Sequence, residues 1–209
     1  MQTDSANRRS RTALGRPRVT SRAALERLAF ELFARRGFDE TTVDDIAAAA
    51  GIGRRTFFRY FASKNDLVWG DFEGHLDRLR VLLDEADADA PMMEAVRAAV
   101  VEFNRYDPQE VPWHRQRMEL ILRVPTLQAD ATLRYAAWRE IITAFVAART
   151  GQPPTAMLPV LSGYVVLAAS ISGYEYWLSV DAAEDLTGIL DVALRRIGDG
   201  LSAADPAAR

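Results

Sequence analysis

The sequence TTVDDIAAAAGIGRRTFFRYF, residues 41–61, predicts two short helices joined by a tight turn. Thr42 and Asp45 have the spacing of a capping box, which marks the start of the first helix. Gly51 suits the left-handed residue that commonly ends a helix, and Gly53 then opens the second one. This combination of cap and turn is typical of a helix-turn-helix motif.

The second helix of the pair has two unlike faces. Phe57 and Phe61 lie four residues apart and are expected to pack on the first helix. Arg54, Arg55 and Phe58 are then left on the outer face, which a helix-turn-helix places in the major groove of DNA. The residues therefore predict a DNA-binding protein; the alternative is a helical hairpin whose arginine face is only solvated.

The flanking residues extend this prediction. Apolar residues at helical spacing from Leu25 to Phe33 predict an amphipathic helix that ends at Gly37 and covers the back of the pair. Ser63 has an acidic residue three positions later, a second capping box, so a fourth helix is expected from Lys64 to the region 84–89. In its first turn, free backbone N–H groups would also favour a phosphate.

Residues 22–67, RAALERLAFELFARRGFDETTVDDIAAAAGIGRRTFFRYFASKNDL, resemble the N-terminal domain of the TetR family of bacterial transcriptional regulators. The resemblance implies DNA contacts through Thr42, Arg54, Arg55, Thr56, Phe58, Tyr60 and Lys64. The family often has a tyrosine where this chain has Phe58, so a phosphate contact through that hydroxyl is not available here. Phe58 could instead touch a thymine methyl group or a sugar.

Charge is distributed unevenly along the 209 residues. Residues 1–65 contain 13 Lys/Arg and 7 Asp/Glu, a net charge of +6, whereas residues 66–209 contain 13 and 22, a net charge of −9, for a total of −3. A basic first third on an acidic remainder favours DNA at one end and a different task at the other.

The first 20 residues are polar and rich in arginine, and we expect them to form a disordered basic arm. Arg16 and Arg18 in the element Gly-Arg-Pro-Arg resemble arms that lie in a narrow minor groove. The alternative is a tail that attracts DNA non-specifically. The arm has no apolar signal region, so a cytoplasmic location is expected.

The remaining helices are marked by apolar periodicity and by breaks at proline and glycine. Helices are expected at about 92–106, about 112–123, from about 133 to 150, about 155–178 and about 182–200. The fold is predicted to be all-α with about nine helices. We expect a helix-turn-helix domain at 21–67, a helical ligand-binding and dimerisation domain at 68–201 and a tail at 202–209.

Residues 150–174 contain no charged side chain, which raises the possibility of a membrane span. Prolines, serines and glycines interrupt this stretch, and the basic residues that flank a membrane span are missing. These features favour a helix buried inside a soluble protein. The last helix has its own apolar stripe, formed by Leu186, Ile189, Leu190, Ala193, Leu194 and Ile197. Two such helices per subunit predict a four-helix homodimer interface, as the TetR resemblance also implies.

The second domain also offers candidates for binding a small molecule. Apolar and cationic side chains within residues 112–139 would suit an amphiphile with an anionic head group. The residues expected to bind it are Trp113, Arg115, Met118, Leu122, Arg134 and Trp138. A plain core with a solvated face is the alternative. This part resembles regulators associated with mycofactocin gene clusters, which implies an effector similar to a fatty acyl-CoA.

Three classes of function follow from the sequence. The first is a ligand-responsive regulator, a repressor that binds a near-palindromic double-stranded DNA operator as a dimer and leaves it when the effector binds. The second is a constitutive DNA-binding dimer. The third is an enzyme that uses Glu102, His114 and Glu119, but no nucleophile–base spacing supports it. The chain has no cysteine and two histidines far apart, so no cofactor or metal site is expected.

Overall fold

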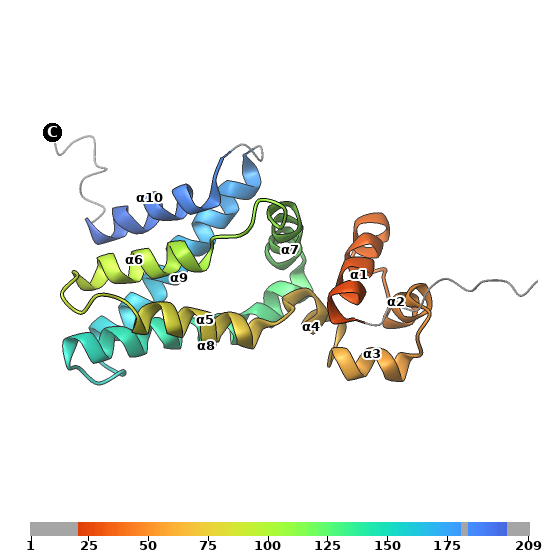
Figure 1. The fold of residues 1–209 in the computed structure, drawn as a ribbon, viewed down its shortest axis with the longest axis horizontal. Coiled ribbons are helices and arrows are strands. Elements are labelled where there is room, and N and C mark those ends of the chain that lie inside the picture. The colour runs from red at the N-terminus through yellow and green to blue at the C-terminus, as the bar shows by residue number, and fades with distance from the viewer. Residues whose placement is uncertain (1–20, 181–183, 200–209) are drawn as a thin grey trace, which may run out of the picture. The chain divides into compact units, whose positions relative to one another are not determined.

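The computed structural model describes residues 21–180 and 184–199 and forms two compact units that divide between Leu67 and Val68. Within the described residues the secondary structure is helical, with ten helices and no strand (Figure 1). The all-α prediction is confirmed. The ten helices agree with the predicted number of about nine, apart from one break described below.

The first unit contains α1 (Arg22–Arg36), α2 (Val43–Ala50) and α3 (Arg54–Tyr60). The predicted capping box at α2 is present in full, with the hydroxyl of Thr42 accepting from the Asp45 N–H at 3.1 Å. Gly51 ends α2 with a φ of 68°, the left-handed conformation predicted for it. Side chains from all three helices form the core of the unit: Leu25, Leu28, Phe30, Phe33, Ile46 and Phe57.

The helix predicted from Lys64 into the region 84–89 is two helices, α4 (Lys64–Trp69) and α5 (Phe72–Asp84). Gly70 separates them with a φ of 63°, and a Cβ at this position would overlap the guanidinium group of Arg117. Asp71 then caps α5 by accepting a hydrogen bond from the Gly74 N–H. Because this break was not predicted, one helix was expected where the structure has two.

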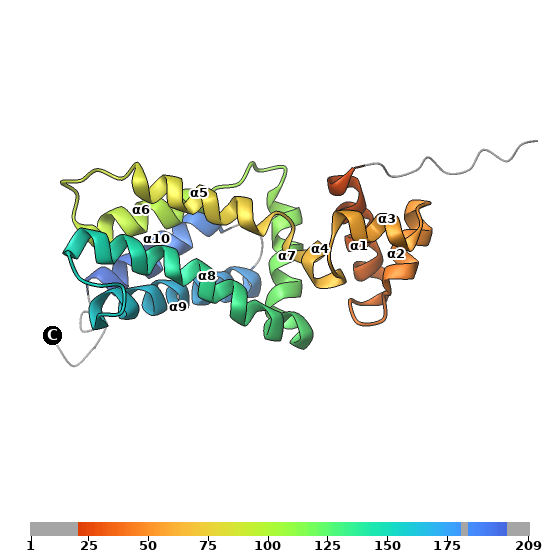
Figure 2. The same ribbon diagram turned by 90° about the horizontal axis from the view of Figure 1, so that it is seen from below.

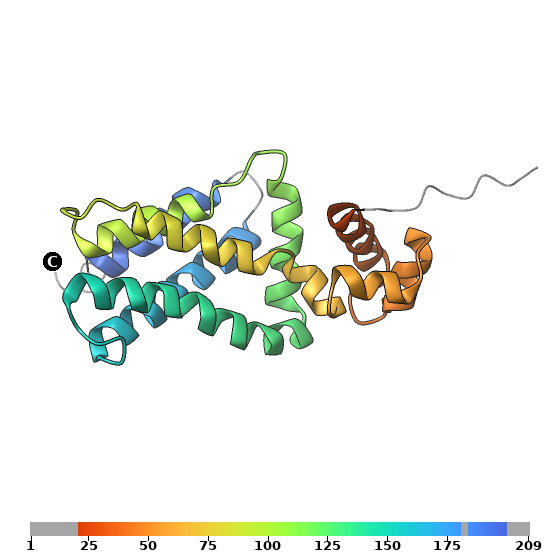
Figure 3. The same cartoon turned by 60° about the horizontal axis from the view of Figure 1, so that its bottom comes forward.

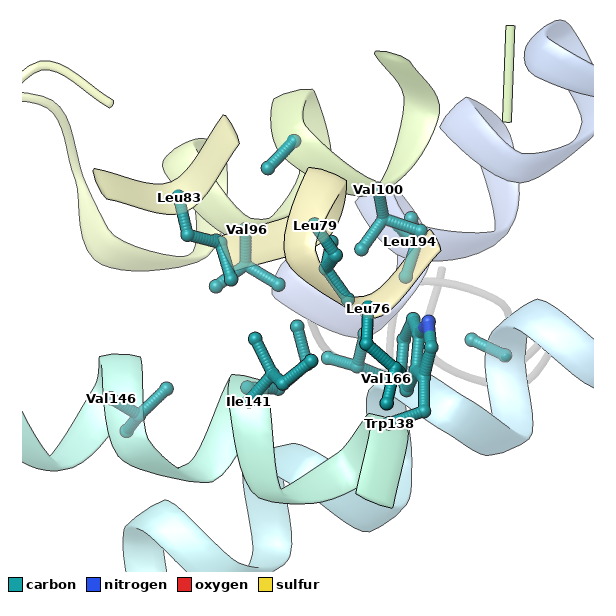
Figure 4. Close-up of a cluster of buried hydrophobic side chains, with 13 residues drawn as sticks. Leu76, Leu79, Leu83, Val96, Val100, Trp138, Ile141, Val146, Val166 and Leu194 are labelled. Carbon is teal, nitrogen blue, oxygen red and sulfur yellow. The ribbon is translucent and has the colours of Figure 1, made fainter. Parts of the chain in front are cut away.

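The second unit adds α6 (Met92–Phe103), α7 (Val111–Arg123), α8 (Pro125–Thr150), α9 (Met157–Ser179) and α10 (Leu186–Gly198). In two views α7 runs across the directions of α5 and α8 (Figures 2 and 3). The main core lies where α5, α6, α8, α9 and α10 converge (Figure 4). It contains Leu76, Leu79, Val96, Val100, Trp138, Ile142, Val166 and Leu194.

The apolar stripe of α10 has a different place from the one predicted. Leu186, Leu190 and Leu194 are buried within the protomer, and Ile189 and Ile197 pack against the same clusters. Their first role is thus to hold α10 on its own subunit, since helical periodicity shows that a face is apolar but not what covers it.

The helix α9, in which Glu175 is the one charged residue, is long and apolar enough, by length and composition alone, to cross a membrane. It packs on α8 and α10, however, with Val166, Gly173 and Trp177 buried. Gly163 also allows a close approach, because a Cβ there would lie against the carbonyl of Arg139 and the hydroxyl of Thr143. Burial on two sides explains the apolar residues on those faces of α9, while Met157, Leu161 and Tyr164 remain exposed.

Candidate DNA interface and effector-binding residues

The exposed face of α3 carries the groups that the sequence predicted for DNA. Phe57 is buried, whereas Arg54 and Arg55 are exposed and the Phe58 residue is 43% exposed. Arg54 forms an ion pair with Asp44 at 2.9 Å, and its guanidinium carbon lies 5.5 Å from the centroid of the Phe58 ring. Both arginines are thus open to solvent on α3, and the Arg54 side chain is oriented by Asp44 and Phe58.

The other candidates in the first unit surround this surface to different degrees. Thr42 is exposed at the start of α2, although its hydroxyl is engaged in the capping box. Thr56 and Tyr60 are half-buried on α3. Arg16 and Arg18 lie outside the described residues.

Lys64 has an internal role that the sequence did not reveal. Its ammonium donates to the carbonyls of Phe38 at 2.7 Å and Thr41 at 2.9 Å, and it lies 4.1 Å from the centroid of the Phe38 ring. Burial lowers the pKa of this group. Thr41 is itself buried and donates to the carbonyl of Gly37 at 2.7 Å. Lys64 therefore fastens the segment between α1 and α2.

The six residues predicted to bind an effector have different surroundings in the structure. Trp138 lies in the main core, whereas Met118 and Leu122 pack on a second cluster formed by Tyr174, Trp177, Leu186 and Leu190. Trp113 is half-buried on α7.

The two predicted cations are engaged within the protein. The guanidinium of Arg115 donates to the carbonyls of Trp177, Leu178 and Val180 at 2.7–3.1 Å and so closes the end of α9. Arg134 pairs with Asp130 at 3.3 Å and lies over the rings of Trp69 and Phe72. The structure therefore gives Arg115 a capping role where the sequence suggested a contact with a head group.

A cavity of about 390 Å³ opens between α5 and α8, and none of these six residues lines it. Arg80, Asp84 and Glu140 line it together with small and apolar side chains of α8. In the described part of the chain, no group of three or more acidic or histidine side chains has the arrangement of a metal site.

Comparison with known proteins identifies both units. The family model for bacterial regulatory proteins of the tetR family matches residues 27–68, and the model of the MftR C-terminal domain matches residues 90–202. This chain belongs to the TetR family of bacterial transcriptional regulators. A curated relative, described as a mycofactocin biosynthesis transcriptional regulator MftR of Mycobacterium tuberculosis, is 46% identical over 188 residues, which cover 90% of this chain and 94% of the relative.

Solved structures share the TetR fold at low sequence identity. The fatty acid degradation regulator FadR of Bacillus halodurans is 18% identical, has a TM-score of 0.64, and is matched over 89% of this chain and 98% of its own. FadR of Bacillus subtilis, solved in complex with stearoyl-CoA, is 16% identical with a TM-score of 0.59 over 83% and 95% of the two chains. The family consists of regulators rather than enzymes.

A buried polar network in the second unit of this TetR-type chain was not predicted. Tyr174 donates to Asn104 Oδ1 at 2.5 Å, and its oxygen lies 2.7 Å from His114 Nε2. Asn104 Nδ2 donates to the carbonyl of Val100, which fixes the amide, so Nε2 of His114 must carry the hydrogen that Tyr174 accepts. Tyr106 stacks on the imidazole with 3.8 Å between ring centroids.

The environment of this network keeps it uncharged. Burial, with the nearby charges of Arg117 and His75, lowers the pKa of His114 from 6.5 to about 3. Burial also raises the pKa of Tyr106 and of Tyr174. Its sequence signal was weak, because isolated Asn, His and Tyr residues at helical spacing look the same whether or not they meet in the fold. As Glu102 pairs with Arg105 and Glu119 is exposed, the three groups considered for an enzyme do not converge into a buried acid–base pair.

Proposed function

We propose that the protein is a repressor that binds a near-palindromic operator as a homodimer and is released by a long-chain acyl-CoA. The observation that carries the DNA-binding part is the exposed cationic face of α3 on a capped helix-turn-helix. Each recognition helix would enter one major groove, with half-sites about 34–36 Å apart or a multiple of this spacing. A regulator of this kind acts in the cytoplasm.

In this proposal Arg55 reaches a base edge, while the other residues set the position of α3 on the DNA. Arg54 is oriented by Asp44 and Phe58, and its charge suits a phosphate or a base. The remaining proposed contacts are Thr42, Thr56, Phe58, Tyr60 and Lys64, together with Arg16 and Arg18 in the arm.

Arg55→Ala and Lys64→Ala are expected to weaken DNA binding in different ways. Loss of a base contact by Arg55 costs about 1–3 kcal/mol on the operator and relaxes specificity at one position. Loss of Lys64 loosens the segment 37–41 and removes a cation, so cognate and random DNA should be bound less tightly by the same factor. Titrations on both DNAs at several salt concentrations measure this. Equal effects of Arg55→Ala on cognate and random DNA would contradict its assignment to a base edge.

The exposed face of α9 supports the homodimer. Large apolar side chains remain open in the protomer along its first two turns and again near its end, with Met157 80%, Leu161 51%, Tyr164 54% and Tyr176 51% exposed. A row of this kind on a core helix is typical of a subunit interface. The α10 contribution would come from Val192, which is 52% exposed, rather than from its buried leucines.

Three observations support an acyl-CoA as effector. The second unit has an apolar interior, and the sequence match to the MftR relative extends over it. Two FadR proteins with this fold are known in complex with stearoyl-CoA and lauroyl-CoA. We propose that binding moves α4, the short helix at the division between the two units, and so changes the distance between the two recognition helices. The effector must then favour the released dimer by about 1–3 kcal/mol.

An operator gel shift with acyl-CoAs of several chain lengths tests the effector, beside calorimetry on the same samples. We expect long-chain acyl-CoAs to bind and to release the DNA, and free CoA to do neither. A complex that persists at saturating acyl-CoA would instead support the second candidate function, a constitutive DNA-binding dimer. The DNA upstream of the protein's own gene is the first operator to test by footprinting.

A further inference from the structure

Two buried hydrogen-bond donors of the second unit have no acceptor among the described residues. They are the indole Nε1–H of Trp69 and the hydroxyl of Tyr135. Trp69 is the last residue of α4 and only 7% exposed, and Tyr135 lies on α8. Buried donors almost always have a partner, and an unmet one opposes folding. Two of them in one domain therefore need an explanation.

The two donors belong to one cluster. The rings of Trp69 and Tyr135 meet edge to face, with 6.0 Å between centroids and an interplanar angle of 81°. Phe72 packs on Trp69 in the same manner at 5.5 Å. The guanidinium carbon of Arg134 lies 5.0 Å from the Trp69 ring centroid and 5.4 Å from that of Phe72. We call these four residues the Trp69 cluster.

The chemistry of the Trp69 cluster selects an oxygen acceptor. An indole N–H can only donate, and a phenol hydroxyl donates readily. The cation of Arg134, which also pairs with Asp130 at 3.3 Å, adds attraction for negative or partly negative oxygen. Next to these polar groups, Phe72 packs against the main apolar core. An acceptor oxygen at the end of an alkyl chain matches both parts, because the chain can lie on the core side and the oxygen on the donor side.

We propose that Trp69 and Tyr135 donate hydrogen bonds to the C1 carbonyl oxygen of a fatty acyl group, present either as a thioester or as a free carboxylate. This inference rests on the proposed function, which named the effector class but no contact with its carbonyl. The donor atoms are covered in this structure, so the ligand reaches them only when side chains of the cluster move. A ligand that satisfies the two donors therefore favours the moved arrangement over the one described here.

The position of Trp69 gives the contact a consequence for regulation. Trp69 ends α4, and Lys64 at the other end of this six-residue helix is bonded to the carbonyls of Phe38 and Thr41 in the first unit. A carbonyl held by Trp69 thus acts on the helix that is anchored in the DNA-binding unit. Through this contact, binding of the acyl group would change the position of α4.

The test compares ligands with and without the carbonyl oxygen. Palmitoyl-CoA carries it as a thioester, palmitate carries it as a carboxylate, and S-hexadecyl-CoA, a thioether, lacks it. We expect Tyr135→Phe to weaken palmitoyl-CoA binding by about three- to tenfold in calorimetry, the effect of one lost hydrogen bond, and to leave S-hexadecyl-CoA binding unchanged. If palmitate binding falls more than palmitoyl-CoA binding, the carboxylate is the natural group; the reverse order identifies the thioester. Either order supports the contact.

Two controls separate this contact from a structural effect. Thr132→Val removes the hydroxyl of a residue that is exposed on α8, and we expect no change in binding of any of the three ligands. Tyr135→Phe should keep or raise the unfolding midpoint, because it removes a buried hydroxyl without a partner. Trp69→Phe gives a second variant, with the same expected difference between thioester and thioether.

The outcomes distinguish this inference from the proposed effector. If the wild-type protein binds no palmitoyl-CoA, the effector class is wrong and the inference falls with it. If the wild-type protein binds palmitoyl-CoA but Tyr135→Phe binds it equally well, or loses thioester and thioether to the same extent, only the contact is overturned. A gel shift on the same variants measures the coupling between palmitoyl-CoA binding and DNA release. A weaker contact with the carbonyl should raise the concentration of palmitoyl-CoA needed to release the DNA.

Discussion

Leu161→Asp is expected to produce a folded monomer that no longer binds the operator. The side chain of Leu161 is half exposed in the protomer, so a carboxylate is solvated there as long as the subunit is alone. In a dimer built on α9, the same carboxylate would be buried without a partner, which costs several kcal/mol. A monomer presents a single recognition helix, and we expect operator affinity to fall at least about a hundredfold because the linked second half-site is lost.

Light scattering and a gel shift on the same sample measure this effect. Val81→Asp is the matched control, since Val81 is equally exposed on α5 and lies away from the proposed interface. Leu167 is a poorer choice, although it lies on the same helix, because it packs against the core of its own subunit and a charge there would also impair folding. A wild-type monomer at micromolar concentration, or a dimeric Leu161→Asp variant, would contradict the proposed interface.

The elements that were predicted correctly are those whose signals are local. The caps of α2 and the turn at Gly51 depend on residues within a few positions of each other, and the structure has them as expected. The break at Gly70 was missed because a glycine inside an apolar helical pattern is often tolerated. Here its left-handed backbone and the Arg117 side chain beside it end α4, and Arg117 comes from a helix that is distant in sequence.

The contacts that the predicted effector residues make within the protein could not be predicted from their chemical type. Arg115 has the charge to bind a head group, but its guanidinium N–H groups donate to the carbonyls at the end of α9. Trp138 had the apolar surface for an acyl chain, but it fills the core. Which polar group remains without a partner depends on how distant helices pack, and this is why Trp69 and Tyr135 emerge only from the structure.

Acid is expected to destabilise the protein because of His114. The folded state keeps this imidazole neutral, with a pKa lowered to about 3, whereas the unfolded chain binds a proton near the ordinary value of 6.5. The stabilisation is therefore complete above pH 6.5 and is lost as the pH falls from 6.5 towards 3. At about 1.4 kcal/mol per pH unit, we expect a loss of about 2 kcal/mol between pH 7 and pH 5.

Urea unfolding at pH 7, 6 and 5, with the protomer concentration held constant, measures this loss. His114→Gln removes the titrating group while it keeps a donor for Tyr174, so its free energy of unfolding should be lower at pH 7 but should change less between pH 7 and pH 5. His75→Gln is the matched control for the other histidine and should retain most of the wild-type pH dependence. Asp45, Glu94 and Asp185 have pKa values lowered by their hydrogen bonds, so they lose their charge at a lower pH than this window. A wild-type protein as stable at pH 5 as at pH 7 would show that His114 is not held neutral by the fold.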